Sequence, residues 1–238
     1  MPESGERQWQ GTTDGTSWMH GALIGMMRVV PLWVFYPLMS LVVPFYMIFN
    51  HKGYLSNYHY FHRVQGFGPI GSFLHVFACH WMFGAVIIDR FASYSGKKFS
   101  MEVPRMSLYE KLCAGNAGFV QISSHIGNEE LAGYELRATK RINALVFGGE
   151  GKTLTENRER ILGGNNVRLV SISGDMSHLV ILNNALADGE IVNIHGDRVF
   201  GSNRTVRREI LGAEAELPLG PFLLASMRGV PAVSVFVM

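Results

Sequence analysis

Charged residues are scarce in this chain of 238 residues. They make up 17% of the sequence, against about 25% in typical soluble domains, while hydrophobic residues make up 47%. The formal net charge is only +2, so the composition gives no sign of nucleic-acid binding. We therefore expect a membrane or lipid partner and no nucleic-acid partner.

The sequence has only two cysteines, and its N-terminus lacks the features of a cleaved signal peptide. The two cysteines, Cys79 and Cys113, are far apart in the sequence, and each lies in an apolar, helix-like context. This pattern predicts reduced, buried thiols and fits a catalytic face in the cytosol. The N-terminus has no basic region before a short apolar core, so we do not expect a cleaved signal peptide.

The apolar residues are concentrated near the N-terminus. Residues 1–17 are polar and predict a flexible lead-in. The segment Pro31–Phe49 has no charge, and its 19 residues reach the roughly 17–25 that cross a bilayer as a helix. We predict an N-terminal apolar helical membrane anchor within residues 1–50. The internal prolines Pro37 and Pro44 favour a kinked re-entrant or interfacial segment as an alternative, and a buried core helix is a third.

The remainder, residues 51–238, is predicted to form one domain. After a further helix at Ile70–Tyr94, short β-branched runs alternate with helical stretches. The pattern predicts an α/β fold with a mainly parallel sheet flanked by helices. The expected strands are Gly118–Ser123, Ala144–Phe147, Arg168–Ile172, Ile191–Ile194 and Ala232–Val237, and the expected helices are Glu129–Thr139, Thr153–Leu162, Met176–Ala187 and Pro221–Met227. The last strand runs into Met238, which fits either an edge strand or a domain that continues.

A histidine follows the first predicted strand. His125 lies in a turn with Gly127 and Asn128, and Glu130 lies in the first turn of the next helix. At a spacing of five residues on one helix, two side chains point about 140° apart, but a turn and a helix can bring them together. We expect Glu130 to accept a hydrogen bond from one His125 nitrogen and to leave the other as a general base. A histidine of purely structural purpose is the alternative.

Several motifs resemble one family in order and spacing. The segment Ser123–Gly133 (SSHIGNEELAG) resembles the His-x4-Asp/Glu block of the lysophospholipid acyltransferase superfamily, and most of all the bacterial lipid A biosynthesis (lauroyl/myristoyl-type) branch. Gly196–Arg198 resembles the Asp-Gln block of that family, with Arg198 where glutamine is usual. Pro218–Ala225 resembles its Pro-x-Gly-Pro-x-x-Leu-Ala run.

The resemblance implies a membrane-associated acyltransferase. It would move a fatty acyl group from a thioester of acyl carrier protein or coenzyme A to a hydroxyl of a glycolipid such as a lipid A precursor. The catalytic face would lie on the cytoplasmic side of the inner membrane, and no cofactor or metal is expected. His125 and Glu130 would be catalytic. Backbone N–H groups at Asn128–Glu130 would be candidate oxyanion donors.

Four residues are predicted to bind substrate, each with a plainer alternative. Asn128 fits an oxyanion donor or a turn residue. Arg158 fits a phosphate ligand or a solvated helix face. Asp197 and Arg198 fit substrate contacts or an ion pair within their turn.

Two other functions remain open. One is a catalytically inactive lipid-binding or assembly protein of the same fold, suggested by Arg198. The other is a serine hydrolase that uses Ser123 or Ser124, although the chain has no Gly-x-Ser-x-Gly elbow.

Overall fold

The computed structural model describes residues 16–135, 138–146, 156, 158–160, 162, 164, 166–172, 174–199 and 204–237. The flexible lead-in predicted for the first residues lies mostly outside this part of the chain. The predicted helix Thr153–Leu162 is described only in part, and its residues Arg158, Glu159, Arg160 and Leu162 are helical.

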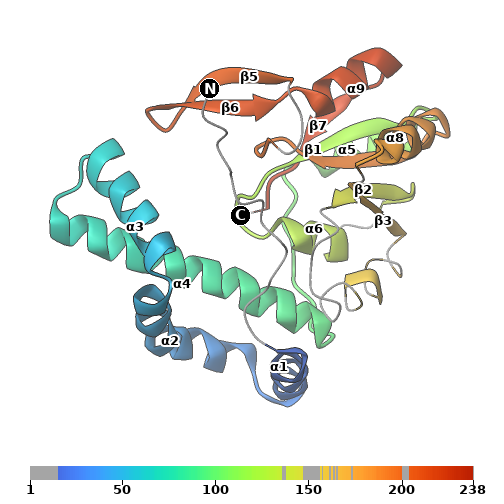
Figure 1. Ribbon diagram of the computed structural model, residues 1–238. Helices are drawn as coiled ribbons and strands as arrows, with labels where there is room; N and C mark the ends of the chain where they lie inside the picture. Colours follow the sequence, from blue (N-terminus) through green and yellow to red (C-terminus); the bar gives the residue numbers. More distant parts are fainter. Residues whose placement is uncertain are drawn as a thin grey trace.

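The N-terminal half is helical. It contains α1 (Ser17–Val29), the 3-10 turn η1 (Leu32–Val34), α2 (Phe35–Phe49), α3 (His51–His59), the π-helical turn η2 (Tyr60–Val64) and α4 (Pro69–Tyr94). Helices α2 and α4 pack against each other (Figure 1). Helix α3 and η2 connect the carboxyl end of α2 to the amino end of α4. Pro44 lies inside α2. A short helix, α5 (Met106–Ala114), then leads to the sheet.

The second half contains a five-stranded parallel sheet, which confirms the predicted α/β class. Its strands lie in the order β3-β2-β4-β1-β7. Their bounds are β1 (Phe119–Ser123), β2 (Ile142–Val146), β3 (Val167–Ser171), β4 (Ile191–His195) and β7 (Ala232–Ser234). Strand β7 is shorter than predicted, but Val237 still forms a parallel bridge with Gly127. The parallel order brings the carboxyl ends of β1 and β4 to the same edge.

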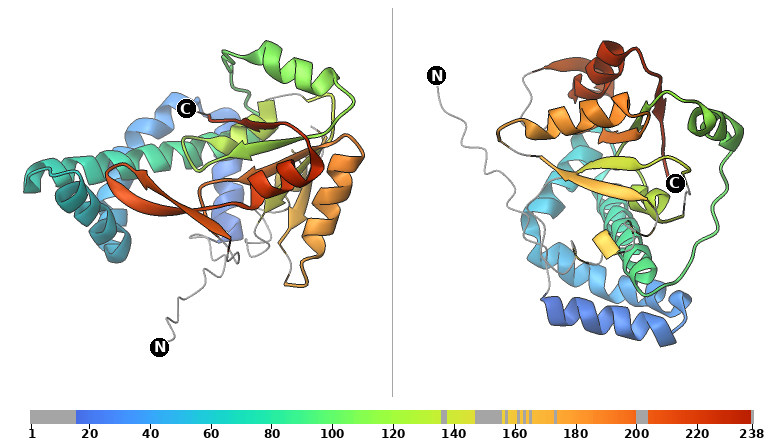
Figure 2. Two further views of the ribbon diagram at one scale, coloured as in Figure 1. Left: turned by 90° about the horizontal axis from the view of Figure 1, so that it is seen from above. Right: turned by 90° about the vertical axis from the view of Figure 1, so that its right-hand side faces the viewer.

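Helices cover both faces of the sheet (Figure 2). On one face, Val120 and Ile122 of β1 pack with residues of α8 (Ser177–Ala187) and α9 (Gly220–Arg228). On the other, Phe119 packs with Tyr109 and Cys113 of α5. This alternation follows from the two-residue period of a strand. Both faces of β1 are therefore buried.

An antiparallel hairpin was not predicted. Strands β5 (Thr205–Ile210) and β6 (Ala213–Pro218) pair with each other and stand apart from the main sheet (Figure 1). Leu211 and Gly212 connect them, both with positive φ, as a tight two-residue hairpin turn requires. These strands are rich in charged residues and largely exposed, so they lack the apolar signal of a core strand.

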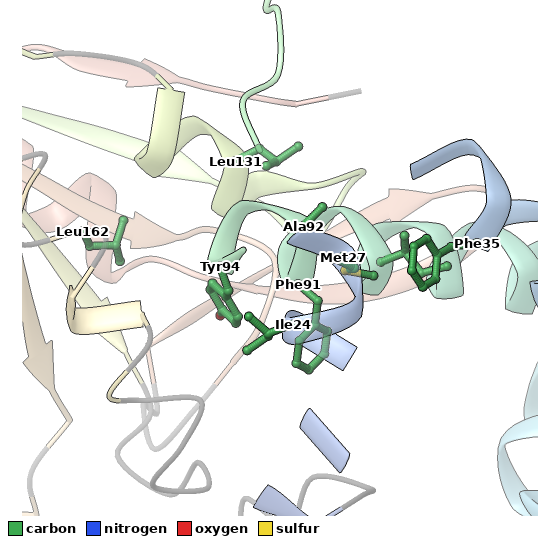
Figure 3. Packing of buried hydrophobic residues seen from close by; sticks show 9 residues of the cluster. Ile24, Met27, Phe35, Phe91, Ala92, Tyr94, Leu131 and Leu162 are labelled. Carbon is green, nitrogen blue, oxygen red and sulfur yellow. The ribbon is translucent and has the colours of Figure 1, made fainter. Parts of the chain in front are cut away.

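The N-terminal helices join the sheet domain through one apolar cluster (Figure 3). Ile24 and Met27 of α1 and Phe91 and Tyr94 of α4 pack in the same cluster as Leu131 of α6 (Glu129–Glu135). The carboxyl end of α4 is therefore fixed beneath the edge of the sheet where β1 ends.

Two helical segments are long and apolar enough to cross a membrane. They are Leu32–Phe49 and Pro69–Tyr94. In the most apolar 18-residue stretch of each segment, only 17% and 22% of the residues, respectively, are buried. Much of their apolar surface faces outward. The large exposed side chains are Leu38, Leu41, Val42, Phe45, Ile48 and Phe49 on α2 and Ile70, Phe73, Leu74, Met82 and Phe83 on α4.

Candidate functional site

His125 lies two residues beyond the end of β1, in the loop that leads to α6. Strand β1 is buried along its whole length, and the chain becomes exposed at His125, whose side chain is 40% accessible. Gly127 has a positive φ of 66°, which turns the chain back toward α6. The strand thus delivers a histidine to the carboxyl edge of a parallel sheet, where active sites of such sheets lie.

The neighbouring strand β4 brings a carboxylate to the same place. Ser123 is paired with His195 in the sheet, and the Gly196 N–H continues the ladder by donating to the Ser123 carbonyl at 2.8 Å. A Cβ atom at Gly196 would lie 2.5 Å from a methyl carbon of Ile122, so only glycine allows this approach. Asp197 follows directly and faces the His125 loop.

Asp197 holds His125 by two hydrogen bonds. The backbone N–H of His125 donates to Asp197 Oδ2 at 2.7 Å, and the imidazole Nδ1 lies 3.1 Å from Oδ1. An ionised carboxylate can only accept, so Nδ1 carries the proton of the pair. In the neutral ring, the Nε2 atom then has a free lone pair.

Two further residues complete the group around His125. The ring of His195 stacks on the ring of His125 with centroids 4.3 Å apart. Glu129, the first residue of α6, places Oε1 3.8 Å from His195 Nε2. One ligand atom each of His125, Glu129 and His195 lies within 4.8 Å of the others. We call these three residues together with Asp197 the rim cluster.

The predicted hydrogen bond between His125 and Glu130 is wrong. Glu130 is only 9% accessible, and its carboxylate pairs with Arg90 Nε at 2.6 Å and with Arg158 Nε at 2.9 Å. The Tyr94 hydroxyl donates to it at 3.0 Å. Consecutive helix residues point about 100° apart, so Glu129 faces β4 and Glu130 faces α4. Asp197 takes the place expected for Glu130.

Asn128 fixes the loop from inside the protein. Its backbone N–H donates to the Val237 carbonyl at 3.0 Å, and its side-chain Nδ2 donates to the Val86 carbonyl of α4 at 3.3 Å. The residue is buried. The N–H predicted as an oxyanion donor is therefore already hydrogen-bonded, and the side chain connects the loop to α4.

The two predicted arginines lie in different settings. Arg158 is 11% accessible and forms its ion pair with Glu130, so its guanidinium faces that carboxylate instead of an open cleft. Arg198 is exposed, and within the described part of the chain it forms no ion pair with Asp197, whose carboxylate holds His125. The alternative of an ion pair within that turn is wrong.

The rim cluster also favours the ionised form of its two carboxylates. Burial by itself would raise the pKa of Asp197, but the hydrogen bonds from His125 outweigh it and the pKa is lowered. Burial would likewise raise the pKa of Glu129, and its interactions with His195 and with its own backbone N–H lower it overall. Both side chains are therefore anionic near neutral pH, beside two imidazoles.

Several buried polar atoms near this edge have no hydrogen-bond partner within the described residues. They include His195 Nε2 and the hydroxyls of Ser123 and Ser124. Neither serine hydroxyl bonds to His125, whose hydrogen bonds go to Asp197. The geometry of a serine nucleophile with its base is thus not present.

Sequence reasoning missed His195 and Glu129. His195 ends β4, one residue beyond the predicted strand Ile191–Ile194, and the ends of neighbouring parallel strands meet at one edge. That rule could have placed His195 beside His125. Which of the two adjacent glutamates faces β4 depends on the rotation of α6, which the sequence does not display.

Comparisons with known proteins add no assignment. No protein-family model matches the chain, and a search of curated proteins finds no significant match.

Proposed function

We propose that this protein is a membrane-associated acyltransferase in which His125 is the general base. The observation that carries the proposal is the Asp197–His125 pair at an exposed sheet edge, with Nδ1 bound and Nε2 free. The ordered motif resemblance supplies the reaction class. Acyl transfer from a thioester needs one base and no covalent acyl-enzyme, because the donor is already activated.

The proposed reaction uses the free nitrogen of His125. Its Nε2 takes the proton of an acceptor hydroxyl while the hydroxyl oxygen attacks the thioester carbonyl carbon. The tetrahedral intermediate collapses, the carbon–sulfur bond breaks, and the thiolate leaves with the proton from the imidazolium. Asp197 holds the ring and stabilises its positive charge. The products are an acyl ester and a free thiol.

Glu130 has a different part in this proposal from the one its motif position implied. Its pairs with Arg90 and Arg158 connect α6 to α4 and to the helical segment around residue 158. This network keeps the loop before α6 in place, so Glu130 supports His125 through the backbone. Asn128 does the same by its bond to Val86.

The lipid acceptor would reach the site from a membrane at α2 and α4. Many large apolar side chains are exposed on these two helices, as expected of a surface that contacts lipid. Helix α4 runs from this apolar region to Tyr94, which bonds to Glu130 just below the rim cluster. A bilayer attached to α2 and α4 would therefore lie on the helical side of the molecule, with the sheet in the cytosol.

The substrates follow from the resemblance alone. We propose acyl carrier protein or coenzyme A as the carrier and a glycolipid hydroxyl, as in a lipid A precursor, as the acceptor. The bacterial inner membrane is the proposed location. Arg198 is exposed next to Asp197, and we propose that it contacts an anionic group of either substrate.

The test is transfer of a labelled acyl group. Membranes from cells that express the chain are incubated with labelled acyl carrier protein or labelled acyl coenzyme A, and the acylated lipids are identified by mass. We expect one labelled lipid that is absent from membranes without the chain. Tight lipid binding without any acylated product from either donor would reject the enzyme and favour the lipid-binding alternative.

A further inference from the structure

The rim cluster holds more ligand atoms than general-base catalysis needs. We propose that His125, His195 and Glu129 bind a divalent transition-metal ion, with Zn²⁺ as the best match. The sequence alone predicts no metal site here. The sheet register brings the three residues together across two strands and a helix.

The three donors have the chemistry of a zinc site. Two imidazole nitrogens and one carboxylate oxygen are a common three-ligand set for zinc, and they leave the fourth tetrahedral position open. In such a site the ligand atoms lie about 3.4 Å apart, given zinc–ligand distances near 2.0–2.1 Å. His195 Nε2 and Glu129 Oε1 are 3.8 Å apart, and no pair in the set exceeds 4.8 Å. Movements of about 1.4 Å or less, together with rotation of the two stacked rings, bring the set to coordinating distance.

Two independent observations point to a bound cation. The first is that His195 Nε2 is buried with no hydrogen-bond partner within the described residues, which is costly unless something occupies it. The second is the Asp197 carboxylate on His125 Nδ1. Metal-bound histidines commonly donate their second ring N–H to a carboxylate, which fixes the ring and makes the ligating nitrogen more basic.

The ion would use the nitrogen that acid–base chemistry requires. With Nδ1 bound to Asp197, only Nε2 of His125 can coordinate, and the same atom is the base in the proposed acyl transfer. Metal binding and proton abstraction by His125 therefore exclude each other. This second part of the inference rests on the proposed function: Zn²⁺ is expected to inhibit acyl transfer by occupying the base.

Binding is measured first, without any activity assay. The protein is purified in detergent without a histidine tag, and Zn²⁺ is titrated by equilibrium dialysis with metal analysis of both chambers. We expect one tightly bound Zn²⁺ per chain, lost in His195→Gln and Glu129→Gln. Asp197→Asn should weaken binding by roughly 10–100-fold, as for other residues that hold a metal ligand in place.

The matched control is His51→Gln. His51 is an exposed histidine on α3, outside the rim cluster, and its replacement should leave the affinity unchanged. Circular dichroism checks that each variant is folded. If a variant does not fold, X-ray absorption of the wild-type zinc complex decides the question, because the inference requires two imidazoles and a carboxylate oxygen around the metal.

The results separate this inference from the proposed function. No zinc binding by the wild type, or equal binding by His195→Gln, overturns the site even if acyl transfer is observed. Zinc binding by a protein that transfers no acyl group keeps the site and rejects the enzyme. Zinc that raises the rate of transfer would support the site and contradict the assignment of His125 as a free base.

Discussion

The imidazole of His125 donates from Nδ1 to the carboxylate of Asp197, a residue 72 positions later in the chain, at 3.1 Å. The same carboxylate accepts the backbone N–H of His125 at 2.7 Å. One side chain thus fixes both the loop and the ring. The pair joins the ends of two neighbouring parallel strands, and it defines which imidazole nitrogen is available for chemistry.

The pair should make stability depend on pH in acid. The pKa of Asp197 is lowered in the folded protein, so folding favours the ionised carboxylate. Its contribution is complete above the ordinary value of about 3.9 and is lost as the pH falls through the lower folded-state pKa. We expect Asp197→Asn to be less stable than the wild type at pH 7, with the difference shrinking below about pH 4. Urea unfolding from pH 7 to pH 3 measures this, and a constant difference would contradict it.

Loss of Glu130 should affect folding directly. Glu130→Ala leaves the guanidinium groups of Arg90 and Arg158 without this carboxylate in a mostly buried setting. Removing one partner of a buried ion pair costs roughly 3–5 kcal/mol. The free energy of unfolding measures the loss, and Glu110→Gln on the exposed face of α5 is the control, expected to change it by less than about 0.5 kcal/mol. Equal stability of Glu130→Ala and the control would disprove the structural role of Glu130.

The close approach of β1 and β4 predicts an effect at Gly196. A methyl group in Gly196→Ala would meet the Ile122 side chain at 2.5 Å, in the packed end of β1. Overpacking of this kind costs about 1–3 kcal/mol. It would also move Asp197 away from His125. Gly220→Ala is the matched control, since a Cβ there meets no atom within 4 Å. Thermal unfolding of both variants checks the prediction, and similar losses of stability would contradict it.

A fluorophore attached to Cys79 can test whether α4 contacts a membrane. The prediction of a buried thiol is wrong for this residue, which lies exposed on α4, between the outward-facing apolar residues Leu74 and Met82. In a Cys113→Ser background, an environment-sensitive fluorophore on Cys79 should shift its emission to the blue when liposomes are added. The control carries the fluorophore through Ser107→Cys at the exposed start of α5, with both native cysteines replaced by serine. An unshifted spectrum at Cys79, or equal shifts at both positions, would contradict attachment through α4.

The fold could be predicted from local patterns to a large extent. The strands of the parallel sheet are short β-branched runs between helical segments, and this alternation predicts the class. The β5–β6 hairpin was not predicted because its strands are exposed and rich in charged residues, such as Arg207 and Glu216, which pair with each other. Such a strand buries little, so no apolar run indicates it.

The site could be predicted only in part. The position of His125 follows from a strand that ends in a turn, and the sequence predicts Asp197 as a substrate-binding residue. Their direct contact depends on the register of β1 with β4, in which Ser123 lies opposite His195. Which of Glu129 and Glu130 faces the rim cluster depends on the rotation of a short helix packed on α4. Both are consequences of tertiary packing that a single sequence does not contain.

The rate of acyl transfer by His125→Gln tests the central claim most directly. Glutamine keeps a polar group at the sheet edge but cannot accept a proton, so the folded variant should lose the roughly 10²–10⁴-fold that a general base contributes. His51→Gln, assayed beside it with the same labelled thioester and membranes, should retain the wild-type rate. A folded His125→Gln protein that transfers the acyl group at the wild-type rate would contradict the account.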